Sequence, residues 1–419
     1  MLHGNLNNLS KSWLLETICE SSPALKLAFK EDKVISIDFS DITNGKGFQS
    51  FIYLATVSYK DIAGRPEQFQ CVLKVPTRVF NDHGVEQTNP EEKTAEFFFE
   101  LVNSLHDQEC LVYKFLGPLA GVGFPIPKVY KTISRNQAAK LSSENKSPVI
   151  VMEFIKGKTA SIFETFTEPQ LLNMAQDLAV LHDEVGQRAD KTWEEGFDTR
   201  FRFHPEAAKM LTNGLEFFKA DVPDSASYID TLKKIDLHWF IRYSMKTLPE
   251  KFNAQTLAHG DAWSNNVIFE ETSDGSTGDK VAAYIDWQMS FWGSQLQDLC
   301  QFLVICTDAE IREVVWEKVL LEYYQKLADL HARRNINVPF TFDEAKEMFQ
   351  VLQVFFGINI ALYYQLNTAV YNAENTEEGR RNKTKLKKRA LEAIKNATRL
   401  VETLGLDDVS DNAEAEVGK

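Results

Sequence analysis

The sequence predicts an α+β protein with two lobes, a β-rich N-terminal lobe and a mainly helical C-terminal lobe. Its 419 residues are more than a single hydrophobic core usually holds. Alternating apolar residues separated by short turns dominate residues 1–155, whereas apolar residues at helical spacing dominate residues 156–404. We therefore expect two domains that meet near residue 155, with a ligand bound in a cleft between them.

The N-terminal lobe begins with a helical pattern over residues 11–30 that Pro23 interrupts. Three runs of strand-type alternation follow, separated by turns, and they predict an antiparallel sheet. These strands are expected at residues 34–39, 51–59 and 68–75. The rest of the lobe is predicted as a helical segment at 94–115 and two strands at 128–132 and 149–154.

The C-terminal lobe is predicted to begin with a helix that follows Thr167, a suitable N-cap residue. A short hairpin interrupts the helical pattern, with strands at 267–269 and 281–285 on either side of Asp274-Gly275. Later helices are expected at residues 311–332, 342–364 and 383–404. Residues 405–419 are acidic and carry few apolar anchors, so we predict a disordered tail.

Composition restricts the class of protein and its partners. The formal net charge of −14 argues against a nucleic-acid partner, because phosphates favour a basic surface. The five cysteines are scattered and odd in number, so we expect reduced, buried thiols rather than zinc ligands or disulfides. No secretory signal is evident, and the longest apolar run, residues 354–364, is too short to span a membrane. These features favour a cytoplasmic protein and leave its oligomeric state open.

One stretch, residues 257–286, has the layout of a phosphoryl-transfer site. Asp261 precedes Asn266 by five residues, and Asp286 closes the apolar run that forms the second strand of the hairpin. An aspartate beside an attacking hydroxyl can accept its proton, while an asparagine and a second aspartate can hold Mg²⁺ on the phosphates of ATP. The alternative, a helix cap and a turn residue, explains each aspartate singly but not the set.

His259 and Asp298 are predicted to support this set. His259, two residues before Asp261, is either a second base or a packed side chain that fixes the loop. One carboxylate base suffices for the reaction, which favours the structural role. Asp298 is expected to cap a helix and brace the same loop rather than to contact a substrate.

Lys74 lies within a predicted strand, where a lysine between apolar neighbours is costly to bury unless it is paired. The functional interpretation is a ligand of the α- and β-phosphates of ATP, held by a glutamate from the next helix. The alternative is an edge-strand lysine whose stem covers apolar surface. Glu109 is the preferred partner because a core-facing stripe of apolar residues surrounds it, whereas Glu96 and Glu100 are expected to face solvent.

Two further segments are candidates for binding the nucleotide. Gly45 and Gly47 lie between the first two strands, where their backbone N–H groups can approach phosphates, although an ordinary hairpin turn explains them equally well. Glu153 and Ile155 lie at the lobe boundary, where backbone groups are able to read the edge of an adenine. The alternative for this second segment is a simple connector.

The surroundings of the central stretch favour a small acceptor. Gly260 occupies the position where protein kinases carry an arginine, and the short run from Asp286 to Asp298 leaves little room for a peptide platform. Aromatic residues of the helical lobe are candidates for an acceptor pocket, although most are expected in the core. They are Trp292, Trp316, Tyr323, Tyr324, Phe355, Phe356, Tyr363 and Tyr364. The basic run 380–389 is predicted to be a solvated helix face.

These motifs resemble those of a known superfamily. His259-Gly260-Asp261, Asn266 and Ile285-Asp286-Trp287 are similar to motifs of the aminoglycoside phosphotransferase and choline kinase superfamily, which has a protein-kinase-like fold. The details look closest to the ecdysteroid-kinase-like (CHK kinase-like) family of invertebrates, and the resemblance covers residues 10–405. Those details are LAHGDAWSNNVIF, YIDWQ, CVLKVP from Cys71, Glu109 before Tyr113, and LAVLHDE around His182.

The resemblance implies ATP and Mg²⁺ as cofactors and the alcohol group of a small molecule as acceptor. It implies that Asp261 is the catalytic base, that Asn266 and Asp286 hold Mg²⁺, and that Lys74, with Glu109, binds phosphates. The best-described activity of the family is the phosphorylation of a steroid hydroxyl, such as that of an ecdysteroid. The alternatives are a choline- or ethanolamine-type kinase, a catalytically silent pseudokinase that binds a ligand, and a metal-dependent hydrolase.

Overall fold

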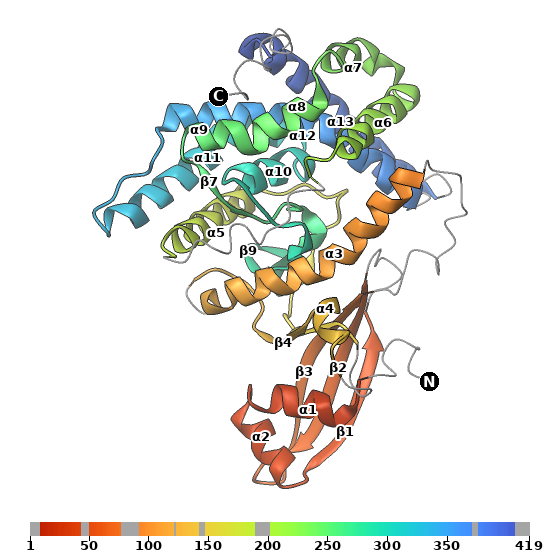
Figure 1. Ribbon diagram of the computed structural model, residues 1–419, viewed down its shortest axis with the longest axis vertical. Helices are drawn as coiled ribbons and strands as arrows, with labels where there is room; N and C mark the ends of the chain where they lie inside the picture. Colours follow the sequence, from red (N-terminus) through yellow and green to blue (C-terminus); the bar gives the residue numbers. More distant parts are fainter. Residues whose placement is uncertain are drawn as a thin grey trace. The chain divides into compact units, whose positions relative to one another are not determined.

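The computed structural model describes residues 9–42, 50–76, 92–120, 123–141, 147–188, 202–370 and 376–406, without the side chains of 92–100, 103, 369 and 370 (Figure 1). The chain forms two compact units. Unit 1 takes residues 1–122, 126–156 and 285–289, and unit 2 takes residues 123–125, 157–284 and 290–419. Unit 1 carries a five-stranded sheet and unit 2 is mainly helical, which confirms the predicted α+β class.

The sheet of unit 1 contains all the strands predicted for the N-terminal lobe. Its order is β1-β2-β3-β5-β4, and every neighbouring pair is antiparallel. Strand β3 is therefore an inner strand, not an edge strand. The bounds are β1 Val34–Asp41, β2 Ser50–Lys60, β3 Pro66–Pro76, β4 Val129–Ile133 and β5 Val149–Glu153.

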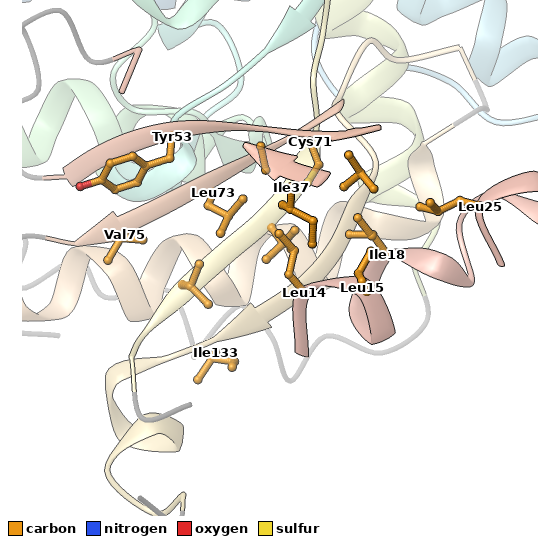
Figure 2. Packing of buried hydrophobic residues seen from close by; sticks show 14 of the residues in the cluster. Leu14, Leu15, Ile18, Leu25, Ile37, Tyr53, Cys71, Leu73, Val75 and Ile133 are labelled. Atoms are coloured by element: carbon orange, nitrogen blue, oxygen red, sulfur yellow. The ribbon is translucent and has the colours of Figure 1, made fainter. Parts of the chain in front are cut away.

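Helices α1 and α2 supply the core of unit 1 (Figure 2). Pro23 is the first residue of α2 rather than a kink within one helix, because a proline at this position gives up no helical hydrogen bond. Cys71, Leu73 and Val75 of β3 point into this core, so side-chain alternation sends Lys74 to the opposite face of the sheet. The helical segments are α1 Lys11–Cys19, α2 Pro23–Lys30, α3 Glu92–Leu116, η2 Gly117–Leu119, α4 Arg135–Ala138 and η7 Trp287–Met289.

Nine α-helices account for most of the described part of unit 2. Thr167 caps the first helix, as predicted, and also forms a reciprocal capping box with Gln170. The α-helices are α5 Glu168–Gly186, α6 Pro205–Asp221, α7 Ala226–Leu232, α8 Leu237–Arg242, α9 Leu248–Lys251, α10 Gln297–Ile305, α11 Ala309–Ala332, α12 Phe342–Val370 and α13 Glu377–Leu404. Shorter helical turns are η4 Pro223–Ser225, η5 Tyr243–Thr247 and η6 Ser264–Asn266.

Two small antiparallel sheets of unit 2 carry the central stretch. The first has the order β6-β8-β9 and contains the predicted hairpin, in which Val267 pairs with Tyr284. Asn266 therefore directly precedes the hairpin, and Asp286 follows its last paired residue by two positions. The bounds are β6 Lys158–Thr159, β7 Gln255–Ala258, β8 Val267–Glu271, β9 Thr277–Tyr284 and β10 Phe291–Ser294, with β7 paired to β10.

Helix α12 is the central helix of unit 2. Among the described residues, its segment Phe342–Thr368 is the one helix long and apolar enough to cross a membrane, but 67% of the most apolar window is buried within the fold. It packs against α6, α10 and α13, and a Cβ added at Gly357 would lie 2.6 Å from Ala397 of α13. These contacts are those of a core helix in a globular protein.

Arg389 corrects the prediction of a solvated face at residues 380–389. Its side chain is 1% exposed, pairs with Asp308 at 2.8 Å and donates to three backbone carbonyl oxygens at 2.7–2.9 Å. Helical periodicity places Arg389 on the same buried face of α13 as Leu386 and Ala393. Charge alone therefore did not identify which face of this helix is solvated.

The cysteines and the C-terminal segment complete the comparison with the predicted fold. All five cysteines are buried and free, as predicted. Helix α13 ends at Gly405, whose φ of +64° suits glycine. The predicted tail lies outside the described residues from position 407 onward.

Candidate active site

The first group of candidate residues lies within unit 1 and is centred on Lys74. Its Nζ atom lies 2.7 Å from Glu109 Oε2, and these side chains are 8% and 1% exposed. Glu109 belongs to the single long helix α3, whereas the side chains of Glu96 and Glu100 lie outside the described residues. The pair is the one preferred from the sequence, and the inner position of β3 excludes the edge-strand alternative for Lys74.

Asp286 belongs to the same group. Its Oδ1 atom accepts a hydrogen bond from Lys74 Nζ at 2.6 Å, and its side chain is 29% exposed. The backbone of Asp286 has a φ of +67°, in the left-handed region that costs a residue other than glycine about 1–2 kcal/mol. The turn η7 follows at once and packs against α3. The carboxylate is thus held at Lys74 by a strained backbone that its surroundings maintain.

The Lys74 group carries one more carboxylate than ammonium groups. Burial raises the pKa of Glu109 to about 7. The charge of Lys74 opposes this rise, and the charge of Asp286 adds to it. Burial also lowers the pKa of Lys74, but Asp286 and Glu109 outweigh it and raise that pKa above its ordinary value. The lysine is therefore charged at neutral pH, and the group as a whole favours the approach of a further cation.

The second group lies within unit 2 and is centred on Asp261. Asn266 Nδ2 donates to the backbone oxygen of Asp261 at 2.9 Å and to its Oδ2 atom at 3.1 Å. A carbonyl oxygen and an ionised carboxylate can only accept, so the nitrogen of Asn266 must face Asp261. The amide oxygen of Asn266 consequently remains as an acceptor of the kind that Mg²⁺ prefers.

Tyr363 of α12 also binds Asp261, which the sequence did not identify. Its hydroxyl group donates to Asp261 Oδ1 at 2.9 Å and accepts from Gln301 Nε2 at 2.9 Å. Gln301 Oε1 in turn accepts from the backbone N–H of Ala262 at 3.1 Å. Each oxygen of the Asp261 carboxylate therefore receives a directed donor. Tyr363 was one of eight aromatic candidates, and nothing local distinguishes it from Tyr364, which bonds Asp221 instead.

Most of the other aromatic candidates lie in the core, as predicted. Four of them are at most 6% exposed, and Tyr323 bonds the ring of His182 at 2.8 Å. Trp316 stacks on Phe349 and is half-buried. These four are Tyr323, Phe355, Phe356 and Tyr364.

His259 and Asp298 hold the loop that carries Asp261. Asp298 is 1% exposed, and its two carboxylate oxygens accept from the backbone N–H groups of His259 at 2.7 Å and Gly260 at 3.0 Å. His259 Nδ1 accepts from the backbone N–H of Asp261 at 3.3 Å. Gly260 has a φ of +79°, which allows the sharp turn between them. Both side chains thus contact the loop backbone. The prediction that Asp298 caps a helix is wrong, because Asp298 lies within the first turn of α10 after the N-cap residue Leu296 and its carboxylate is taken up by the loop.

Arg202 is a second residue of this group that the sequence did not identify. It donates to the backbone oxygen of Gly260 at 3.0 Å and lies over the ring of Phe291 at 4.1 Å. Burial lowers the pKa of Arg202 to about 10, although the carboxylates of Asp261 and Asp298 oppose that shift. Arg202 is distant in sequence from the central stretch, so no local motif indicates it.

The remaining nucleotide candidates are only partly described. Gly45 and Gly47 lie outside the described residues. The backbone N–H of Glu153 donates to the backbone oxygen of Lys128 at 2.8 Å, so it has no proton to offer an adenine. The Glu153 carboxylate accepts from the backbone N–H of Lys128. Ile155 follows the end of β5, and no backbone hydrogen bond involves it among the described residues. The backbone of Ile155 fits the predicted contact better than that of Glu153.

The donor sets fit a bound ATP–Mg²⁺ complex. Asp286 and Asn266 offer hard oxygen atoms, and the excess negative charge around Lys74 suits a cation. No group of three or more His, Cys, Asp or Glu side chains able to hold a metal occurs in the described part of the chain. Mg²⁺ is commonly held by one or two carboxylates together with substrate phosphates, whereas a metal-dependent hydrolase needs more protein ligands.

Comparisons with known proteins found a curated relative, similar solved structures and a family model. In sequence, 198 residues, or 46% of the chain, are 27% identical to acyl-CoA dehydrogenase family member 11 of Rattus norvegicus. The chain spans only 22% of the length of that curated relative.

Solved structures similar to the chain include three small-molecule phosphotransferases. Choline kinase of Cryptosporidium parvum Iowa II is 12% identical with a TM-score of 0.49, covering 95% of this chain and 98% of its own. Ethanolamine kinase of Plasmodium vivax is 14% identical with a TM-score of 0.42, covering 92% and 94%. The ADP-bound aminoglycoside phosphotransferase APH(2'')-Ib is 16% identical with a TM-score of 0.40, covering 89% and 99%.

A family model matches residues 26–404, which include every candidate residue from Lys74 to Asp298. That family is described as "Uncharacterized oxidoreductase dhs-27". It is the ecdysteroid-kinase-like family that the sequence motifs resemble. The chain therefore belongs to this ecdysteroid-kinase-like family.

Proposed function

We propose that this chain is an ATP- and Mg²⁺-dependent kinase that transfers the γ-phosphoryl group to an alcohol group of a small molecule. The observation that carries the proposal is the position of Lys74 Nζ, which lies 2.7 Å from Glu109 and 2.6 Å from Asp286. A buried ammonium group between two carboxylates, one of them partly exposed, is the arrangement expected of a phosphate-binding lysine beside a metal ligand.

The residues of unit 1 bind and orient the nucleotide in this proposal. Lys74 contacts phosphate oxygens, Glu109 fixes the lysine side chain, and Asp286 is a ligand of Mg²⁺. Asn266 is the second proposed Mg²⁺ ligand. The backbone of Ile155 contacts the adenine. Bound ATP–Mg²⁺ supplies the phosphoryl group and neutralises part of its charge.

Asp261 accepts the proton of the acceptor hydroxyl and directs its oxygen atom toward the phosphorus. Tyr363 and Asn266 hold the carboxylate from two sides, and His259 and Asp298 hold the backbone beneath it. An ionised carboxylate offers about four acceptor positions, so donors that orient it can leave room for a hydroxyl to approach. The energetic contribution is pre-organisation of the base.

The oxidoreductase descriptions of the family and of the rat relative do not lead to a different proposal. Every strand pair in the described residues is antiparallel. Dinucleotide-binding domains of dehydrogenases are built on a parallel sheet with a glycine-rich turn after the first strand. The match to the rat protein covers 22% of its length, so its name need not describe the matched segment.

Phosphorylation assays with a panel of alcohols test the proposal. Ecdysteroids are the first acceptors to test because of the family, followed by choline, ethanolamine and amino sugars. The chain is expected to consume ATP with one member of the panel in the presence of Mg²⁺. Asp261→Asn should abolish this turnover, and Asp279→Asn, the same change at an exposed position on β9, should leave it intact.

Two outcomes would contradict the proposal. Retained ATP binding without turnover on any acceptor would favour the silent pseudokinase. Turnover that survives in Asp261→Asn would place the base elsewhere. Weakened Mg²⁺–nucleotide binding in Asp286→Ala is the expected result for a metal ligand, and unchanged binding would remove Asp286 from that role.

A further inference from the structure

A second polar site lies within unit 2, in a cavity lined by residues of α11, α12 and α13. Figure 1 shows these three helices. The cavity has a volume of about 400 Å³, in the range of ligand-binding pockets. Its charged and amide side chains include Arg312, Gln353, Glu392, Lys395 and Arg399, and none of the candidate active-site residues lines it. Gln353 and Tyr363 are ten residues apart on α12, or about 15 Å along its axis.

Arg312 is a buried guanidinium group without an ion pair. It is 2% exposed, and no carboxylate lies within ion-pair distance of it among the described residues. Its Nη1 atom makes a long hydrogen bond to the backbone oxygen of Thr307 at 3.5 Å, and its Nη2 atom is buried without a partner. Buried charges are normally paired, because removing an ion from water is costly.

Arg389 shows what a satisfied buried arginine looks like in the same unit. It is equally buried but pairs with Asp308 at 2.8 Å and fills its remaining donors with backbone oxygens. The carboxylates of Glu313 and Glu392, which also line the cavity, raise the pKa of Arg312 against the effect of its burial, but neither forms an ion pair with it. A bound water could accept one N–H of Arg312 but would not supply a paired counter-charge. The difference between the two arginines therefore indicates a missing anion rather than a missing water.

The neighbouring amides present a further donor to the cavity. Arg399 can only donate, and its contact with Asn396 at 2.8 Å therefore orients Asn396 Oδ1 toward it. Asn396 Nδ2 then donates to Gln353 Oε1 at 3.0 Å, which leaves Gln353 Nε2 buried without a partner. Two carboxylates also line the cavity: Glu392, which is already paired with Lys395 at 2.9 Å, and Glu313, which is exposed on α11.

We propose that this cavity is a binding site for a small oxyanion, a carboxylate or phosphate group that pairs with Arg312 and accepts a hydrogen bond from Gln353. Lys395 and Arg399 add positive charge to its walls. Half-buried Trp316 forms an apolar wall. The volume accommodates an organic group attached to the anion. The site is separate from the proposed phosphoryl-transfer site.

Thermal unfolding with defined anions tests this site. The full chain is titrated with inorganic phosphate and, separately, with acetate, each in the low millimolar range against sodium chloride of equal ionic strength. A saturable rise of the unfolding midpoint is expected with at least one of the two anions, because a ligand of the native state stabilises it. Phosphate alone raising the midpoint would indicate a phosphate-bearing ligand, and acetate alone a carboxylate.

Three variants assign the response to the cavity. Arg312→Met should lose the saturable response and, without anion, unfold at the same or a higher temperature, since it removes an unpaired buried charge. Gln353→Met should move the half-maximal concentration upward by about tenfold. Lys318→Met removes one charge from an exposed position of the same helix and should respond as the wild type does.

The outcomes separate this proposal from the kinase proposal. Lys74→Met removes the proposed phosphate ligand of unit 1 and should keep the anion response. Three results would overturn the proposed site. They are an unchanged response in Arg312→Met, a lost response in Lys74→Met, and no saturable response of the wild type to either anion. General stabilisation by phosphate at high concentration is not saturable and affects all variants alike.

Discussion

Replacing Tyr363 by phenylalanine removes one oxygen atom and two hydrogen bonds. The bond to Asp261 Oδ1, at 2.9 Å, has a charged acceptor and contributes about 1.5–3 kcal/mol. The bond from Gln301, also at 2.9 Å, is neutral and contributes about 0.5–1.5 kcal/mol. Gln301 is 2% exposed, so its N–H group would be left buried without an acceptor. We expect Tyr363→Phe to lower the free energy of unfolding by about 2–4 kcal/mol.

The catalytic effect of the same change should be confined to turnover. Tyr363 orients the proposed base and belongs to unit 2, whereas the Lys74 group that is proposed to bind nucleotide belongs to unit 1. We expect kcat to fall by about tenfold, which corresponds to about 1.4 kcal/mol of lost transition-state stabilisation. The KM for ATP should stay close to that of the wild type. Steady-state kinetics with the acceptor found in the panel measure both constants.

Tyr324→Phe is the matched control for this experiment. The hydroxyl of Tyr324 donates to the backbone oxygen of Phe340 at 3.0 Å, a single neutral bond worth about 1 kcal/mol. Urea unfolding of the two variants and the wild type gives the comparison. The reasoning is refuted if Tyr363→Phe is no less stable than Tyr324→Phe, or if its loss of activity appears as an equal rise in KM for ATP.

Three other changes test the electrostatics of the two units. Lys74→Met should abolish nucleotide binding and destabilise unit 1, and adding Glu109→Gln should restore stability but not binding, as measured by calorimetry and urea unfolding. Burial raises the pKa of Asp177 to about 7, so the native state binds more protons than the unfolded state between about pH 4 and pH 7, and stability falls as pH rises through that window. Asp177→Asn should flatten this dependence, and an unaltered slope would show that another group causes it. Arg389→Met should cost about 3–5 kcal/mol by leaving Asp308 unpaired.

The features that could be predicted from the sequence are those that depend on residues close together in the chain. Strand alternation indicated that Lys74 is a buried lysine in need of a partner, and helical spacing indicated that Glu109 faces the core. The pairing of Lys74 with Glu109 could therefore be predicted from the strand period and the helix period. The capping box at Thr167 and the hairpin after Asn266 were also predictable, because turns and caps use short-range chemistry.

Long-range contacts explain what the sequence did not predict. Tyr363 and Arg202 reach the Asp261 loop from segments far away in the chain, and their neighbours in sequence look no different. Arg389 was assigned to a solvated face because it lies in a basic run, whereas its burial depends on carbonyl groups contributed by other segments. Charge composition cannot distinguish a surface arginine from one that ties several segments together.

The assignment of Ile285–Met289 to unit 1 affects how this protein can be divided for experiments. A fragment ending at residue 156 would contain Lys74 and Glu109 but would lack Asp286, and with it the turn η7 that packs against α3. Such a fragment would expose a surface that the intact chain covers and would present its lysine with one counter-charge instead of two. Domain exchange between relatives should therefore transfer this pentapeptide together with the N-terminal segment.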